Sequence, residues 1–307
     1  MTTSGTVHRE YGVAAPGYRL PAGTRLGPVE LQVADLERSI AYYERVIGLR
    51  VLQRTGAAAS LGPLGGATPL VLLRELRGAA PVPRRGRLGL YHFAILLPER
   101  AALGRFVAHL RALGVAAGMS DHLVSEAIYL TDPDGLGIEV YADRPRSAWR
   151  QVEGQLVMAT DPLDVGSLPE AAGGTRWAGA PDGTVIGHVH LFVDDLDRAT
   201  AFYHAGLGFD KMVWSYPGAL FLGAGGYHHH LGTNTWAAGA PAAGPSDARM
   251  LAWTLVLPGP ADVVGALDSL AKAGAAVERS TEGGRAADPW GTPVRVTHEV
   301  VPAPASA

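Results

Sequence analysis

The chain repeats itself at a fixed spacing, and this duplication constrains the fold more than any other feature of the sequence. The stretch VADLERSIAYYERVIGL, which starts at Val33, returns as VDDLDRATAFYHAGLGF from Val193, 160 residues later. Further along, HFAILLPERAALGRFVAHLRALG parallels AWTLVLPGPADVVGALDSLAKAG at the same offset, and TDPDGLGIEV matches ADPWGTPVRV at an offset of 156. Such a repeat indicates one structural unit used several times, and it argues against an all-helical or a doubly wound fold.

Each copy reads as an apolar strand, an Asp-Leu turn, a helix closed by glycine, and further strands. Four such units start near residues 27, 90, 186 and 250. Residues 143–185, between the second and third units, are rich in Pro, Gly, Asp and Ala and are predicted to be a linker. We therefore expect an irregular arm over 1–25, a two-unit domain over 26–142 and a second two-unit domain over 186–301.

Composition limits the partners and ligands of the protein. A formal charge of -3 and a charged fraction of 18% give no reason to expect a nucleic-acid partner. No stretch approaches the ~20 apolar residues of a membrane span, and no leader-like pattern opens the chain, so we expect no membrane partner and a cytoplasmic protein. The absence of cysteine leaves histidine, carboxylate and water to hold any metal.

The four-unit pattern resembles the vicinal oxygen chelate superfamily, which includes glyoxalase I, bleomycin- and fosfomycin-resistance proteins, and type I extradiol ring-cleaving dioxygenases. The resemblance covers nearly the whole chain after residue 25. It implies an α+β fold in which four βαβββ modules pair into two curved, cup-like sheets. It also implies that metal ligands come from the first strand and the last strand of a module.

The ligand positions differ between the copies. The first-strand position holds, in chain order, Pro28, His92, His188 and Ala252. The last-strand position is Glu139 in the second unit and Arg295 in the fourth. Two histidines and one carboxylate make the facial triad of non-haem iron(II) oxygenases, which leaves positions open for substrate and dioxygen. The resemblance thus implies an Fe(II) site at His92, Glu139 and His188, with Mn(II) as the alternative ion.

This distribution bears on how the modules pair. Pairing in sequence order leaves each cup with an incomplete triad. Pairing of the second unit with the third, and of the first with the fourth, places all three ligands in one cup and none in the other. Complementarity of the residues favours this nested arrangement, although sequence alone leaves both open.

The stretch DHLVSEAIYLTDPDGLGIE, residues 121–139, resembles the extradiol dioxygenase signature of a His, an aliphatic-Tyr pair, an acidic-Pro-x-Gly turn and the ligand Glu. Ser120 is a minor departure from that pattern. The resemblance implies that Tyr129 hydrogen-bonds the substrate oxygen and that His122 lines the substrate side. A buried tyrosine satisfied locally is the alternative for Tyr129.

Three consecutive histidines occur in GYHHHLGTNTW, residues 226–236. In extradiol enzymes a His-His pair on a late strand places its second member in the dioxygen pocket as acid–base catalyst. The match implies this role for His229, while alternation along a strand turns His228 and His230 to the other face. A shift of one residue would exchange these roles, and a solvated loop is the remaining alternative.

Aromatic and histidine side chains near these positions are candidates for the substrate pocket. His190 lies two residues from His188, so both face the same side of a strand. His190 is a second candidate for the ligand position, but the spacing of the family ligand from the Asp of the turn favours His188. We expect His190, Trp214 and Tyr216 to contact the substrate, with Trp236 in the same wall.

The function implied by the resemblance is an Fe(II)-dependent extradiol dioxygenase of the kind represented by catechol 2,3-dioxygenases, acting in aromatic hydrocarbon catabolism. Its partners would be a small aromatic diol and dioxygen, and assembly into homo-oligomers is left open. The alternatives are a hydroquinone-cleaving dioxygenase, a glyoxalase-like metal-dependent lyase or isomerase, and a non-catalytic resistance-type binding protein.

Overall fold

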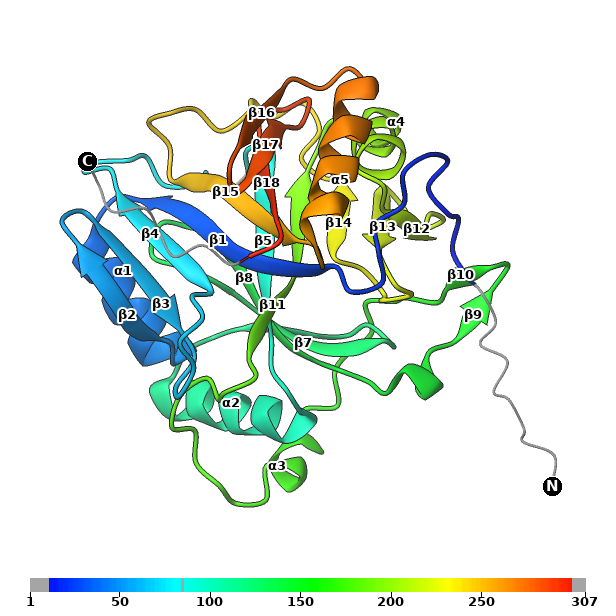
Figure 1. Cartoon of the computed structure of the whole chain (residues 1–307). Helices are drawn as coiled ribbons and strands as arrows, with labels where there is room; N and C mark the ends of the chain where they lie inside the picture. The colour runs from blue at the N-terminus through cyan, green and yellow to red at the C-terminus, as the bar shows by residue number, and fades with distance from the viewer. Residues whose placement is uncertain (1–10, 84–85, 300–307) are drawn as a thin grey trace, which may run out of the picture.

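The computed structural model describes residues 11–83 and 86–299, and its strands form two eight-stranded sheets and one small hairpin (Figure 1). The first module contains β1 (Arg25–Val33), α1 (Leu36–Tyr42), β2 (Arg50–Thr55), β3 (Ala58–Gly62) and β4 (Val71–Glu75). The second contains β5 (Gly89–Leu96), α2 (Arg100–Leu113), β6 (Gly118–Asp121), β7 (Ser125–Thr131) and β8 (Gly137–Asp143).

The second half of the chain repeats this order of elements. The third module contains β11 (Val185–Phe192), α4 (Leu196–Ala199), β12 (Asp210–Val213), β13 (Ala219–Gly223) and β14 (Leu231–Asn234). The fourth contains β15 (Arg249–Val256), α5 (Pro260–Lys272), β16 (Val277–Ser280), β17 (Gly283–Ala287) and β18 (Pro293–Thr297). The predicted α+β fold of four βαβββ modules is confirmed.

The modules pair in the nested order. One sheet runs β12-β13-β14-β11-β5-β8-β7-β6, with β5 antiparallel to β11, and so joins the second and third modules. The other runs β16-β17-β18-β15-β1-β4-β3-β2 and joins the fourth and first through β15 and β1. We refer to them as the β5–β11 sheet and the β1–β15 sheet. Each sheet thus draws one module from residues 26–142 and one from residues 186–301. The division of the chain into two domains at residues 143–185 stays a prediction.

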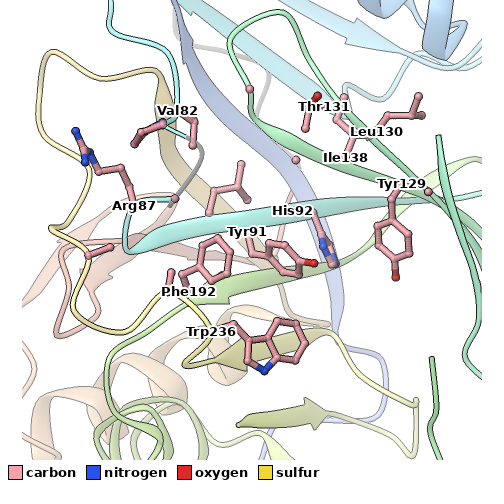
Figure 2. Close-up of a pocket in the computed structure, with 18 of the residues that line it drawn as sticks. Val82, Arg87, Tyr91, His92, Tyr129, Leu130, Thr131, Ile138, Phe192 and Trp236 are labelled. Atoms are coloured by element: carbon pink, nitrogen blue, oxygen red, sulfur yellow. The ribbon is translucent and has the colours of Figure 1, made fainter. Parts of the chain in front are cut away.

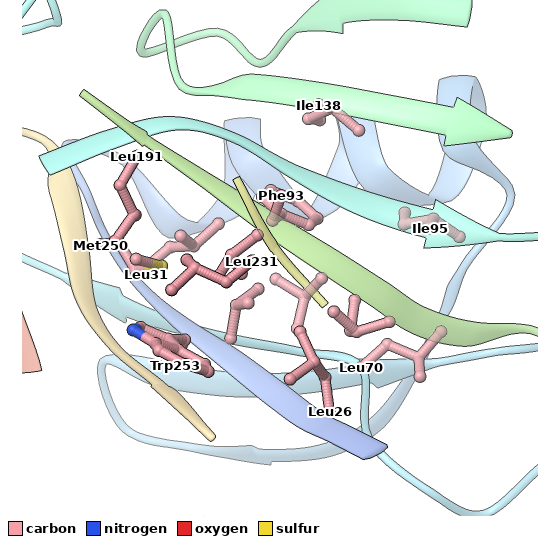
Figure 3. Close-up of a cluster of buried hydrophobic side chains, with 14 of the residues drawn as sticks. Leu26, Leu31, Leu70, Phe93, Ile95, Ile138, Leu191, Leu231, Met250 and Trp253 are labelled. Atoms are coloured by element: carbon pink, nitrogen blue, oxygen red, sulfur yellow. The ribbon is translucent and has the colours of Figure 1, made fainter. Parts of the chain in front are cut away.

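The hydrophobic core joins the two sheets. One continuous cluster contains Phe93 and Leu191 from the β5–β11 sheet together with Leu31 and Trp253 from the β1–β15 sheet (Figure 3). Side chains alternate across a strand, so burial of Phe93 in this core turns its neighbour His92 to the opposite face. Core packing therefore fixes which face of each sheet is available for a site.

The Asp-Leu turns and the acidic turns are structural in both halves. Asp35 and Asp195 cap their helices by accepting a hydrogen bond from the backbone N–H of the third residue onward. Asp132 accepts a hydrogen bond from the backbone N–H of Leu136. It also accepts one, at 3.3 Å, from the hydroxyl of Tyr43, which lies in the π-helical continuation of α1 over Tyr43–Ile47.

The fourth module repeats this arrangement, because Asp288 accepts the N–H of Thr292 and the hydroxyl of Tyr203.

The predicted linker is more ordered than its composition suggests. It contains the hairpin of β9 (Gln151–Val152) and β10 (Gln155–Leu156), and the short helix α3 (Leu168–Ala171). Gly104 of α2 lets α3 approach closely, since a Cβ there would lie 2.3 Å from the carbonyl oxygen of Leu168.

The predicted arm, where described, is irregular and crosses to the third module, where Arg19 pairs with Asp210 at 2.7 Å. Residues 1–10 of the arm and 300–301 of the last segment lie outside the described residues. Within the described ranges no helix has both the length and the apolar character needed to cross a membrane.

Candidate metal centre and its cavity

Three neighbouring strands of the β5–β11 sheet bring the predicted ligands together. His92 lies on β5, Glu139 on β8 and His188 on β11. Ala94 of β5 is in register with both Glu139 and His188, so its methyl group leaves the space between them open. All three ligand side chains are buried.

The three side chains have the geometry of a metal site. Nε2 of His92 and Nε2 of His188 lie 3.1 and 3.2 Å from Oε2 of Glu139, and one ligand atom from each residue lies within 4.8 Å of the others. Adjacent ligands of a first-row metal with bonds of ~2.1 Å are roughly 3 Å apart. Apart from this contact of Nε2 with Glu139, which is not aligned as a hydrogen bond, the ring nitrogens of His92 have no partner among the described residues, which is unusual for a buried imidazole. The cluster therefore fits a metal ion.

The protonation states also suit ligands. Burial lowers the pKa of His188 to about 4, so its imidazole is neutral near pH 7. Burial opposes ionisation of Glu139, but the adjacent histidines outweigh it and hold the pKa of this carboxyl well below its usual range. A carboxylate and a neutral imidazole are the forms that bind a cation.

Two β-bulges shape the site. The register between β5 and β11 slips at Gly187 and again at Tyr91, each of which is the extra residue on its strand. A Cβ on Gly187 would lie 1.8 Å from the hydroxyl of Tyr141, so only glycine fits immediately before His188. The bulge at Tyr91 brings this ring onto the same side as its neighbour His92.

His122 and Tyr129 lie together at the cavity. Nδ1 of His122 lies 2.6 Å from the carbonyl oxygen of Ala159, which can only accept, so Nδ1 carries the proton. Nε2 of His122 then accepts from the hydroxyl of Tyr129 at 2.5 Å. Burial and the negative charge of Glu139 raise the pKa of Tyr129 well above 10, which keeps it a neutral donor.

The three consecutive histidines do not lie on a strand. They form a bend that leads into β14, and all three are buried, so the solvated loop is excluded. His229 lines the cavity, with its ring centroid 4.1 Å from that of His188. Burial lowers the pKa of His229 well below 6.5. His230 turns away to accept the N–H of Ala224, while His228 bonds both His229 and Asp143.

The predicted substrate-contacting residues divide into two groups. His190 lines the cavity and bonds the side chain of Asn234 at 3.0 Å, and Tyr216 and Trp236 line it as well. Trp214 does not line this cavity, and its contact with the substrate stays a prediction. The chain leaves β12 at Val213, so strand alternation does not carry through to Trp214, whose side chain is 38% exposed.

The cavity has a volume of about 230 Å³ and includes residues that sequence reasoning missed. Those residues are Tyr91, Ser120, Met158, Ala159, Thr160 and Phe221. Residues 158–160 belong to the predicted linker, and no motif marks them. Tyr91 was missed because a bulge breaks the alternation on which the prediction depended.

A wider groove of about 1480 Å³ adjoins the cavity, and both are bounded by Tyr91, His92, Tyr129 and Trp236. Figure 2 shows Tyr91 and Phe192 side by side on this groove, with Trp236 beyond them. Apart from Arg87 its wall is mainly apolar and small side chains. Tyr91 and Trp236 therefore stand between the compact cavity and open solvent.

The corresponding place in the β1–β15 sheet has other chemistry. Glu30 there is the counterpart of His190, since it faces Ala252 as His190 faces His92. Glu30 is buried and forms ion pairs with Arg74 and Arg295. The β1–β15 sheet, which was expected to lack metal ligands, thus has an ion-pair cluster at the corresponding place.

Comparisons with known proteins agree with this architecture. The model of the family described as "Glyoxalase/Bleomycin resistance protein/Dioxygenase superfamily" matches residues 25–140 and 185–296. A protein of Bacillus subtilis (strain 168) named catechol-2,3-dioxygenase is 46% identical over 270 residues, which cover 87% of this chain and 94% of the relative. At this identity and coverage the expectation of a dioxygenase, an oxidoreductase, is confirmed.

Solved structures support the fold alone. A putative dioxygenase from Bacillus subtilis superposes with a TM-score of 0.61 at 13% identity, over 91% of this chain and 86% of the other. Glyoxalase I from Zea mays superposes with a TM-score of 0.52 at 18% identity, over 90% and 92%. With both segments matched by the family model and a curated relative nearly half identical, this chain belongs to the Glyoxalase/Bleomycin resistance protein/Dioxygenase superfamily.

Proposed function

We propose that the protein is an Fe(II)-dependent extradiol dioxygenase that cleaves catechol or a substituted catechol beside its two hydroxyls to give a 2-hydroxymuconic semialdehyde. The observation that carries this proposal is the buried His92–Glu139–His188 cluster at a cavity that also holds His229 and Tyr129. The name of the curated relative supports the same substrate.

Fe(II) held by His92, Glu139 and His188 would supply positive charge that favours loss of protons from the diol, and open positions that the diol and dioxygen could share. Mn(II) accepts the same nitrogen and oxygen ligands. The donor set of two neutral imidazoles and one carboxylate leaves a net positive centre with either ion.

The residues of the chain bind and orient the ring. Tyr216, Phe221 and Trp236 offer flat apolar walls, and Tyr91 separates the cavity from the outer groove. Such walls exclude water and strengthen each polar contact made inside. We assign substrate contacts to His190 and Tyr216.

The proton-transfer roles fall to three residues. His229 is a buried, neutral imidazole at the cavity, suited to accept a proton from the diol and return it later. Tyr129 is a neutral phenol that can donate to a substrate oxygen in place of His122. His122 is held by the carbonyl of Ala159, and so keeps its acceptor nitrogen directed at Tyr129.

The glyoxalase-like alternative is disfavoured by the lining of the cavity. Isomerase chemistry of that kind requires a second carboxylate as base, whereas Glu139 is the single carboxylate among the described residues that line the cavity. A non-catalytic binder does not require a buried histidine such as His92, whose polar contact among the described residues is the carboxylate of Glu139.

The test is reconstitution with Fe(II) under anaerobic conditions, followed by a panel of ortho- and para-diols with oxygen uptake recorded. We expect oxygen consumption and a yellow semialdehyde with catechols, and no turnover in metal-free protein. Turnover of para-diols alone would identify a hydroquinone-cleaving enzyme. Full metal occupancy without oxygen uptake on any diol would contradict the proposal.

A further inference from the structure

A chain of hydrogen bonds leads away from His229 to a carboxylate outside the cavity. Nδ1 of His229 lies 2.7 Å from Nδ1 of His228, and Nε2 of His228 lies 2.9 Å from Oδ1 of Asp143. Asp143 ends β8, the strand that carries Glu139. The His228 side chain is completely buried, whereas the carboxylate of Asp143 is partly exposed, so the chain of bonds runs from the cavity towards the surface.

We propose that Asp143 and His228 are positioning residues that hold His229 as its Nδ1–H tautomer, with Nε2 free as the base that faces the cavity. This inference rests on the proposed function of His229. Neither His228 nor Asp143 lines the cavity, so both act through His229.

The tautomer follows from what each group can donate. A carboxylate accepts only, so Nε2 of His228 carries the proton of the bond to Asp143. In a neutral imidazole the other nitrogen is then an acceptor, which leaves Nδ1 of His228 without a proton. The short contact between the two Nδ1 atoms requires one donor, and this must be His229.

The surroundings keep this arrangement in place. The ring of His228 packs against Tyr227 and Trp149, with centroids 4.1 and 5.3 Å away. The hydroxyl of Tyr227 lies 3.3 Å from the same oxygen of Asp143, and the hydroxyl of Tyr141 lies 2.7 Å from that of Tyr227. His228 therefore has little freedom to flip its ring or exchange its partners.

Without the carboxylate the preference disappears. An amide in place of Asp143 can donate to Nε2 of His228, which then carries its proton on Nδ1 and donates to His229. His229 would in that case carry its proton on Nε2 and present a donor to the cavity where a base is needed. A wrong histidine tautomer lowers turnover while the fold stays intact.

The direct test is the tautomer of His229 in the full-length, iron-free protein labelled with ¹⁵N-histidine. Long-range ¹H–¹⁵N correlations distinguish Nδ1–H from Nε2–H, and the signal is assigned by its loss in His229→Gln. We expect Nδ1–H in the wild type and a shift toward Nε2–H in Asp143→Asn. The control is Asp268→Asn, the same change at an exposed ion pair with Arg279, which should leave the tautomer as it is.

A second readout is turnover with Fe(II) and catechol. Asp143→Asn should lower kcat by about 10–100-fold, as for loss of an orienting partner, with little change in KM or iron content. A wild-type His229 protonated on Nε2, a His228 protonated on both nitrogens, or an unchanged tautomer in Asp143→Asn would each overturn the inference. A tautomer shift in a protein that oxidises no diol would instead contradict the proposed function and leave the assignment of the tautomer intact.

Discussion

The two sheets are built from the same modules, yet one presents a His-Glu-His cluster that can hold a metal and the other an ion-pair cluster. Asp35 caps a helix of the β1–β15 sheet's modules, and Asp195 caps the equivalent helix of the β5–β11 sheet's modules. The central strand pair of each sheet, β1 with β15 and β5 with β11, has bulges. Both also carry an acidic turn bonded to a tyrosine hydroxyl. What the copies share is therefore the scaffold, and what differs between them is the chemistry.

The difference is concentrated on a few positions. His92, Glu139 and His188 correspond to Ala252, Arg295 and Pro28 in the other sheet. Each sheet still buries a carboxylate at this place, and a buried carboxylate needs a positive or donating partner. Glu139 has two imidazoles and room for a cation, whereas Glu30 has two arginines.

The largest expected effect comes from removing the carboxylate of each sheet in turn. Glu139→Gln should abolish oxygen uptake with catechol, a loss of more than ~100-fold, because the metal keeps only two imidazole ligands. Glu30→Gln should leave turnover per folded molecule unchanged. It should lower the free energy of unfolding by about 1–3 kcal/mol, since two partly exposed arginines lose their partner. Initial rates of oxygen uptake measure the turnover, and urea unfolding measures the free energy of unfolding. Equal loss of turnover in the two variants would remove the distinction between the sheets.

The next effect concerns the three histidines, which the β1–β15 sheet lacks. His229→Phe should retain iron and catechol binding but lose turnover by ~10²–10⁴-fold, because a positioned proton-transfer group is gone. The control is His230→Asn, in which an amide oxygen can still accept the N–H of Ala224. Single-turnover kinetics after anaerobic binding separate the steps. Loss of turnover in His230→Asn with normal rates in His229→Phe would show that the assignment is off by one residue.

The same histidines make stability depend on pH. Burial lowers the pKa of His230 to about 3, against about 6.5 in the unfolded chain. As pH falls below 6.5 the unfolded chain takes up a proton that the folded chain does not, so the free energy of unfolding decreases. This continues until the pH reaches about 3.

His230 changes the free energy of unfolding by at most about 1.4 kcal/mol per pH unit. We expect the unfolding free energy of metal-free His230→Asn to fall less between pH 6.5 and 4 than that of the wild type. Parallel curves would contradict the assignment of this dependence to His230.

The smallest effect compares the bulges of the two sheets. Gly187→Ala places a Cβ 1.8 Å from the hydroxyl of Tyr141, so β11 has to shift beside His188. Gly27→Ala in β1 meets only the methyl groups of Thr254 and Val256, at 3.0 Å. We expect Gly187→Ala to cost about 1–3 kcal/mol of unfolding free energy and to weaken iron binding. Gly27→Ala should cost less and leave iron unchanged. A thermal melt with an iron titration checks both, and a larger cost at Gly27 would contradict the account.

The repeat made most of the fold predictable. Four copies of one pattern predicted four strand–helix–strands units, and the family resemblance implied that these are βαβββ modules. The complementary ligand positions favoured the nested pairing that the sheets confirm. Alternation along β11 predicted that His188 and His190 share a face, and the repeat put His92 at the equivalent ligand position of β5, which the structure pairs with His190. These predictions held because they depend on local periodicity and on comparison between copies.

The remaining features depend on geometry that a sequence pattern does not express. The bulge at Tyr91 and the bend at His228 both break alternation, so Tyr91 was missed and His228 was expected to point away from His229. Trp214 lies beyond the end of its strand, and residues 158–160 reach the cavity from a segment without a motif.

The central claim is that one of the two sheets holds iron and the other does not. Crystals of the full chain loaded anaerobically with Fe(II), with diffraction recorded on both sides of the iron absorption edge, test it most directly. We expect one anomalous peak per chain, within bonding distance of His92, Glu139 and His188, and none near Glu30. A peak at the Glu30 cluster, or a fully loaded protein with no peak between the three predicted ligands, would contradict it.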